Sequence, residues 1–107
     1  MPTRQKRMDN TLTQHIEATP GVLGGKARIA GHRIRVMDIV VWHEGRGMSP
    51  DEIVDHYPGI TLADVYAALA YYFDHRAEIQ AEFEREAKLV ATAKAHHISR
   101  LQAKLNG

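Results

Sequence analysis

Residues 24–36 have the sequence Gly24-Gly25-Lys26-Ala27-Arg28-Ile29-Ala30-Gly31-His32-Arg33-Ile34-Arg35-Val36. Apolar and polar side chains alternate along this segment, which is the period of a β-strand. The central Ala30-Gly31-His32 supplies a turn, and the glycine pair at the start permits a second bend. We therefore predict two short strands, at about 27–29 and 33–36, that form a small hairpin.

The two faces of this predicted hairpin differ in chemistry. Because side chains alternate along a strand, Ile29, Ile34 and Val36 are expected to point inward. The opposite face then carries three arginines, which are Arg28, Arg33 and Arg35. Like charges repel, so these guanidinium groups need either phosphate groups or carboxylates from the acidic segment downstream. For Arg33 we favour pairing with a carboxylate.

The residues before the hairpin predict little regular structure. Residues 1–14 are polar and contain a cluster of Lys and Arg, which we interpret as a flexible basic arm. Residues 15–18 are predicted to form a short strand, after which Pro20-Gly21 turns the chain.

The residues after the hairpin have helical periodicity and clear helix boundaries. A first helix begins at Met37 and ends at Gly45-Arg46-Gly47. It carries apolar residues on more than one side, which is typical of a helix in the core or in a dimer interface. Ser49-Pro50-Asp51-Glu52 predicts the start of a second helix, with Ser49 as N-cap and Glu52 closing a capping box. This helix is expected to end near His56.

Thr61 predicts the start of a third helix, with Asp64 at its third position. Its apolar stripe comprises Leu62, Val65, Tyr66, Leu69, Ala70 and Phe73. Two helices joined by a tight turn, behind a preceding helix, match a helix-turn-helix arrangement. The third helix has no Lys or Arg before Arg76, whereas side chains that read base edges are mostly Arg, Lys, Asn and Gln. Tyr71 and Tyr72, which we interpret as exposed, are candidates for hydrogen bonds to DNA.

Residues 76–107 contain strong helix formers and no Gly or Pro before Gly107, which predicts one long helix. An apolar stripe at spacings of three and four runs along it and is interrupted by Lys94. A helix of this kind usually packs on a second copy or on a different protein. The candidate contact residues are Ile79, Phe83, Leu89, Val90, Ile98 and Leu101.

Charge is distributed unevenly along the 107 residues. Residues 1–35 hold seven Lys or Arg against two acids, residues 36–86 hold three against eleven, and residues 87–107 hold four and no acid. Such segregation predicts basic ends that meet phosphate or an acidic partner. The alternative is that the basic ends neutralise the acidic middle within a dimer.

The composition excludes several classes of protein. There is no cysteine, so disulfides, thiolate metal sites and cysteine nucleophiles are excluded. No apolar run approaches the ~20 residues of a membrane span and no signal-peptide core is present, so we expect a cytoplasmic protein. His96 and His97 point about 100° apart on a helix and do not form a ligand pair. Because no catalytic triad or carboxylate pair stands out, we expect no metal, no cofactor and no enzymatic activity.

Three blocks of the sequence resemble a known bacterial family. They are residues 24–36, Gly47-Met48-Ser49-Pro50-Asp51-Glu52-Ile53, and Tyr57-Pro58 followed by Leu62-Ala63-Asp64-Val65-Tyr66-Ala67-Ala68-Leu69. Together they resemble the domain family of unknown function numbered 433, with Ala27 in place of the family's proline and His32 in place of its threonine. The resemblance covers about residues 15–75. It implies a helix-turn-helix-like fold and the role of antitoxin in a type II toxin–antitoxin pair.

The expected fold is mainly α-helical with a small N-terminal β-hairpin. It comprises an arm (1–14), a helix-turn-helix-like three-helix core (15–75) and a long C-terminal helix (76–107). The resemblance implies a homodimer that binds operator DNA and a PIN-like ribonuclease toxin, the toxin through the C-terminal helix. The DNA candidates are Lys26, Arg28, Arg33, Arg35, Tyr71 and Tyr72. The acidic site of such a toxin suits the basic residues of the tail, which are Lys88, Lys94, Arg100 and Lys104.

Two alternatives to the antitoxin role stay open. One is a stand-alone transcription regulator that binds DNA and whose long helix only dimerises. The other is a structural oligomer that binds no nucleic acid.

Overall fold

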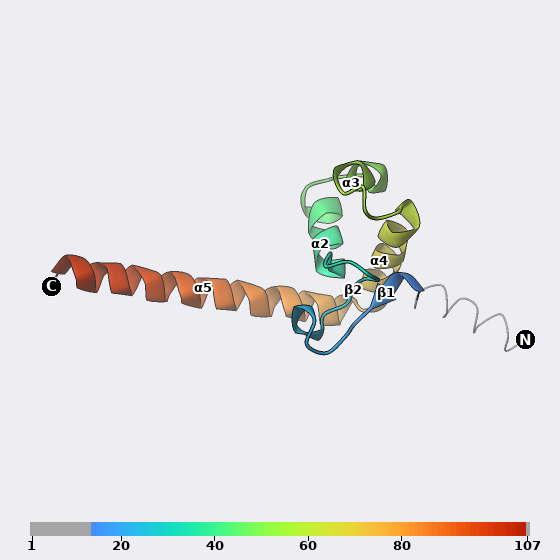
Figure 1. Cartoon of the computed structure of the whole chain (residues 1–107). Coiled ribbons are helices and arrows are strands. Elements are labelled where there is room, and N and C mark those ends of the chain that lie inside the picture. Colours follow the sequence, from blue (N-terminus) through green and yellow to red (C-terminus); the bar gives the residue numbers. More distant parts are fainter. Residues whose placement is uncertain (1–13, 107) are drawn as a thin grey trace, which may run out of the picture. The chain divides into compact units, whose positions relative to one another are not determined.

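The computed structural model describes residues 14–106, and these residues form two short strands and four α-helices (Figure 1). The expected class, mainly α-helical with a small N-terminal hairpin, is confirmed. The chain divides into two compact units, one that ends at His75 and one that begins at Arg76. The predicted basic arm lies outside the described residues, except for Gln14.

A two-stranded sheet opens the first unit. Strand β1 (Ile16–Glu17) pairs antiparallel with strand β2 (Arg28–Ile29), so that Ile16 lies opposite Ile29 and Glu17 opposite Arg28. Ile16 and Ile29 are both buried, whereas Glu17 and Arg28 occupy the other face. The alternation expected of a strand therefore holds, although each strand is only two residues long.

Two turns bracket β2. The 3₁₀ turn η1 (Leu23–Gly25) precedes it, and Gly31 follows it with a φ of 77°, a value that glycine adopts without strain. The His32 amide donates to the Ile29 carbonyl at 3.0 Å. The turn at residues 30–32 therefore forms as predicted.

The predicted strand at 33–36 does not form, and β2 pairs with β1 instead. One isolated bridge joins Arg28 to Arg35, and Val36 is already the first residue of a helix. The reason is a capping interaction, because the Arg35 amide donates to Asp38 Oδ2 at 2.9 Å. Because the helix begins at Val36, only Arg35 of the predicted second strand is paired with β2.

Helix α2 (Val36–Val40) lies at the centre of the first unit. Its buried residues are Val36, Met37, Ile39 and Val40. A π-type turn, η2 (Val41–Gly45), continues it. Apolar residues on several sides left two alternatives for this helix, the core or a dimer interface, and the burial of these four residues shows that it lies in the core.

Helices α3 (Pro50–His56) and α4 (Leu62–Asp74) begin where their capping boxes predict. Ser49 Oγ accepts a hydrogen bond from the Glu52 amide at 3.1 Å, and Thr61 Oγ1 accepts one from the Asp64 amide, also at 3.1 Å. The buried residue Ile60 lies in the turn between the two helices. The helix-turn-helix-like order of α2, α3 and α4 is therefore specified largely by local signals.

The face of α4 that packs in the core differs from the apolar stripe that the sequence predicts. Its buried residues are Val65, Ala67, Ala68, Leu69 and Tyr72. Leu62, Tyr66 and Phe73 are 40%, 56% and 56% exposed. The predicted exposure of Tyr72 is wrong, because this side chain is only 1% exposed. The small side chains of Ala67 and Ala68 allow α4 to approach its packing partner α2 closely.

The second unit is helix α5 (Arg76–Asn106), a single continuous helix of 31 residues, as its run of helix formers predicts. Two residues near its start, Ile79 and Glu82, are buried. The residues from 87 to 105 are exposed.

A histidine–carboxylate pair joins the start of the sheet to α4. His15 Nδ1 lies 2.7 Å from Asp64 Oδ1, and it donates because an ionised carboxylate only accepts. Burial raises the pKa of the Asp64 carboxyl. The hydrogen bonds from the Thr61 amide, from His15 and from the Thr61 hydroxyl outweigh that effect, so the pKa lies below the ordinary value of 3.8.

We predict that Asp64 stabilises the fold only where it is ionised. Because its pKa is lower in the folded than in the unfolded chain, its contribution is present above the unfolded value and is lost as the pH falls through the folded value. Asp64→Asn should lower the free energy of unfolding at neutral pH and flatten its decline between about pH 5 and about pH 2. Urea unfolding across that range measures both effects. An acid slope equal to that of the unmodified chain would contradict the assignment.

Candidate functional site

The Arg28 side chain is held by oxygen atoms of its own chain. Its Nη2 lies 2.8 Å from Glu17 Oε1 on the paired strand, and its Nη1 donates to the His32 carbonyl at 3.0 Å. Nη2 also approaches Thr19 Oγ1 at 3.4 Å. Since the side chain is only 11% exposed, Arg28 is not available for a phosphate contact.

Arg35 makes a bidentate ion pair with Asp38. Its Nη2 donates to Asp38 Oδ1 at 2.9 Å and its Nε donates to Oδ2 at 3.2 Å. Phosphate groups and carboxylates were the two kinds of partner considered for the hairpin arginines. Arg28 and Arg35 both pair with carboxylates. Both residues were candidates for DNA contact, and both use their guanidinium groups inside the chain.

Arg33 behaves in the opposite way to its two neighbours. We favoured a carboxylate partner for it, and that prediction is wrong, because Arg33 is exposed and forms no ion pair with any residue of the described range 14–106. Lys26, the fourth basic candidate, is half-buried. Arg33 is thus the hairpin arginine that presents its charge outward.

The two tyrosines proposed for DNA contact lie in different environments. Tyr72 is buried in the core and cannot reach a ligand. Tyr71 is half-buried and stacks on His75, with ring centroids 4.0 Å apart and an angle of 14° between the planes. The His75 Nδ1 atom also lies 2.9 Å from the Tyr71 carbonyl oxygen. Tyr71 therefore contributes to the structure at the end of α4 rather than to a polar surface that could contact DNA.

The outward side of α4 is apolar. We call it the α4 outer stripe, which consists of Leu62, Tyr66, Ala70 and Phe73. Spacings of four, four and three place these residues on one helical face. Sequence periodicity finds the stripe but does not separate it from a second apolar run at helical spacing (Val65, Ala68, Leu69, Tyr72), which lies beside it and takes the core position. A DNA-reading helix would present polar side chains here, so the outer stripe favours contact with protein.

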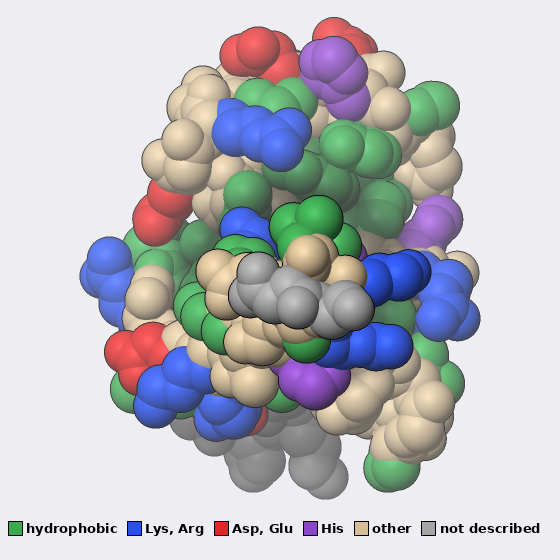
Figure 2. Space-filling view, turned by 90° about the vertical axis from the view of Figure 1, so that its left-hand side faces the viewer, with side chains coloured by type: hydrophobic (Ala, Val, Ile, Leu, Met, Phe, Trp, Pro, Cys, Tyr) green, Lys and Arg blue, Asp and Glu red, His purple; other side chains and the backbone are tan. Residues whose placement is uncertain are grey.

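The predicted partner residues of α5 divide into covered and exposed groups. Ile79 is 1% exposed and Phe83 is half-buried, so these two residues offer little apolar surface to a partner. Leu89, Val90, Ile98 and Leu101 are 70%, 52%, 54% and 46% exposed. Exposed hydrophobic side chains are also visible beside Lys and Arg in Figure 2. The available apolar surface of α5 therefore lies in its second half.

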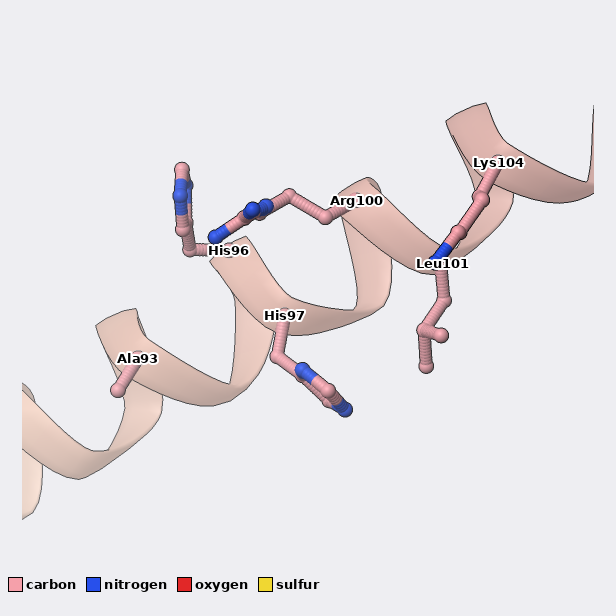
Figure 3. A pocket seen from close by; sticks show the side chains of 6 residues that line it. All are labelled: Ala93, His96, His97, Arg100, Leu101 and Lys104. Atoms are coloured by element: carbon pink, nitrogen blue, oxygen red, sulfur yellow. The ribbon is translucent and has the colours of Figure 1, made fainter. Parts of the chain in front are cut away.

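Basic residues lie close to these apolar residues on the second half of α5. They contribute to a shallow hollow lined by Ala93, His96, His97, Arg100, Leu101 and Lys104 (Figure 3). Figure 3 shows the Arg100 side chain running back along the helix on the same side as His96, while His97 and Leu101 point to the other side. All six residues belong to one helix, so the hollow is a surface and not an enclosed cavity.

Within 14–106, no three His, Asp or Glu side chains lie close enough together to hold a metal ion. In the same part of the chain, no helix is both long enough and apolar enough to cross a membrane.

The three-helix core, the two-stranded sheet and the long last helix define a small helix-turn-helix-like protein with exposed apolar and basic surfaces. The model of the family "Protein of unknown function (DUF433)" matches residues 16–72, and the chain belongs to this family. The resemblance carried by the three sequence blocks is thereby confirmed.

The fold is similar to the crystal structure of a DUF433 member protein from Anabaena variabilis ATCC 29413. The two chains are 35% identical, the match covers 75% of this chain and 78% of the other, and the TM-score is 0.61. No curated protein matches the chain.

We predict that the two arginines of opposite environment differ in their effect on stability. Arg28→Ala removes charged hydrogen bonds from a nearly buried site and should lower the free energy of unfolding by about 1–3 kcal/mol. Arg33→Ala is the matched control and should change it by less than about 0.5 kcal/mol. Urea unfolding of the two variants makes the comparison. A loss for Arg33→Ala as large as that for Arg28→Ala would contradict the assigned environments.

Proposed function

We propose that the chain is the non-enzymatic antitoxin of a type II toxin–antitoxin pair and that the second half of α5 binds the toxin. The observation that carries this proposal is the exposure of Leu89, Val90, Ile98 and Leu101 on one helix. Soluble proteins rarely leave a run of large apolar side chains in water unless another molecule covers it. An amphipathic helix that lies in a groove of a partner is a common way to bury such a surface.

The charge of this segment indicates the chemistry of the partner. Residues 87–107 contain Lys88, Lys94, Arg100 and Lys104 and no Asp or Glu. Complementary charge accelerates association and selects among partners. A PIN-like ribonuclease, which the family resemblance implies as toxin, has an acidic metal-binding active site that fits this basic half of α5.

A repressor role is the second candidate function, and the exposure of Arg33 favours it. Arg33 lies just after the turn that follows β2, in a helix-turn-helix-like core, and its charge is directed outward. The apolar α4 outer stripe weighs against reading of base edges. We therefore propose that operator DNA is held by phosphate contacts from Arg33, assisted by Lys26.

The toxin contact is tested with two substitutions on different faces of α5. Leu101→Ser removes an apolar contact and should weaken binding to the toxin by about tenfold or more. Gln102→Ser, one residue further on and also exposed, should change the affinity by less than about twofold. The complex is first isolated by expressing the untagged chain with the neighbouring gene of its operon, and the affinities are then measured by calorimetry.

The outcome of the co-expression decides between the proposals. Purification of the chain without a neighbouring protein would contradict the antitoxin role, and operator binding would then support a stand-alone regulator. Equal weakening by Leu101→Ser and Gln102→Ser would show that the toxin does not use this face of α5.

The repressor role is tested by the salt dependence of operator binding. Arg33→Ala should weaken binding and reduce the slope of log affinity against log salt by about one, because one phosphate contact is lost. Arg28→Ala should leave the slope unchanged, since Arg28 is paired with Glu17. A slope that Arg33→Ala does not alter would remove Arg33 from the DNA surface.

A further inference from the structure

The exposed face of α4 is apolar along almost its whole length. The exposed residues of this helix before its last position are Leu62, Ala63, Tyr66, Ala70 and Phe73. Of the two charged residues in α4, Asp64 is half-buried and bonded to His15, and Asp74 is the last residue. The solvent side of a surface helix is normally polar or charged. The α4 outer stripe is therefore typical of a surface that another molecule covers.

Large and small side chains are placed on this face so that it is complementary to itself. Tyr66 lies two residues before position 68 and Ala70 lies two residues after it. Leu62 and Phe73 flank the same position at six residues before and five after it. A second α4 that crosses the first antiparallel, with a two-fold axis at residue 68, therefore sets its Ala70 against Tyr66 and its Leu62 against Phe73. Each Tyr66 ring then lies over a small side chain.

Helical geometry allows both contacts at once. At 3.6 residues per turn, the four residues of the α4 outer stripe fall within about 80° of arc. The large side chains occupy one edge of this arc, and Ala70 lies toward the other edge, next to the exposed Ala63. In an antiparallel pair each edge faces the same edge of the second helix. The large side chains therefore meet in one apolar cluster, while the alanines let the two helices approach closely.

We propose that the α4 outer stripe is the interface between two copies of this chain, which pair through α4 in antiparallel orientation. The charge of Asp74 selects this orientation. Antiparallel pairing brings its exposed carboxylate to the N-terminal end of the second α4, where the helix dipole is positive. Parallel pairing would place two Asp74 carboxylates together at two negative helix ends, which is repulsive.

The length of α4 sets the strength expected of this dimer. The helix has 13 residues and is about 20 Å long. The contact between two helices of this length lies at the small end of the range for specific protein–protein interfaces. We therefore expect a dimer that forms at micromolar rather than nanomolar concentrations of the chain.

The pairing goes beyond the proposed function and does not depend on it. The interface uses residues of the first unit only, whereas binding of the toxin is assigned to the second half of α5. Self-association of the purified chain and capture of a toxin are separate measurements, so either can fail while the other stands.

Sedimentation equilibrium of the full chain and two matched substitutions tests the interface. The unmodified chain should dimerise. Ala70→Glu sets two carboxylates into the centre of the apolar contact and should weaken the dimer by about tenfold or more. Ala95→Glu makes the same change at an exposed helical position outside α4 and should leave the dimer within about twofold. Equal effects of the two substitutions would overturn the proposal. A monomeric chain would also overturn it and would leave the α4 outer stripe to a different protein.

The orientation and register are tested by exchanging the large and the small side chain. In a homodimer Tyr66→Ala leaves a gap in both contacts, whereas Ala70→Tyr sets tyrosine against tyrosine, so each variant alone should pair more weakly than the unmodified chain. A mixture of the two variants should pair at least about threefold more tightly than either alone, since every contact again has one tyrosine opposite one alanine. Such a gain also shows that both variants are folded. No preference for the mixed dimer would overturn the proposal.

Discussion

The bidentate contact between Arg35 and Asp38 determines how the first unit is built. The same carboxylate that binds the guanidinium group also accepts the Arg35 amide, and this ends the hairpin and begins α2 at Val36. Helix α2 then fills the centre of the core, against which α4 packs. The contact also neutralises a charge that would otherwise face solvent. Residues 28–35 are basic and resemble a phosphate-binding surface in sequence. Because Arg28 and Arg35 are paired with Glu17 and Asp38, these two arginines stabilise the fold instead.

Local signals in the sequence predict local structure well in this protein. Ser49 and Thr61 cap their helices as expected, because a capping box involves residues only three positions apart. The burial of Tyr72 and the exposure of Phe73 were not predicted, since two apolar runs at helical spacing compete for the core and packing against α2 decides between them. Likewise, the charge count of the hairpin could not show which arginines find carboxylates. For Arg28 that choice depends on strand register, which places Glu17 opposite it, whereas Arg35 takes the carboxylate of Asp38 three residues further on.

For the second unit, amino-acid composition alone reveals little about the proposed binding surface on α5. The basic excess of residues 87–107 is evident from the sequence, but its significance depends on which side of the helix each charge occupies. With α5 continuous from Arg76 to Asn106, four large apolar residues of its second half, Leu89, Val90, Ile98 and Leu101, are exposed to solvent. These exposed apolar and basic residues are the observations that support the proposed contact with a protein partner.

The most direct test is amide hydrogen exchange along α5 in the full chain, alone and in the presence of the protein that the neighbouring gene encodes. A single exposed helix is only marginally stable in water, so its amides exchange quickly unless another helix covers them. If the second half of α5 is an interaction surface, protection of residues 88–105 should rise when that protein is added while that of α2 and α4 stays constant. Unchanged protection of residues 88–105 in its presence would contradict the central role given to this surface.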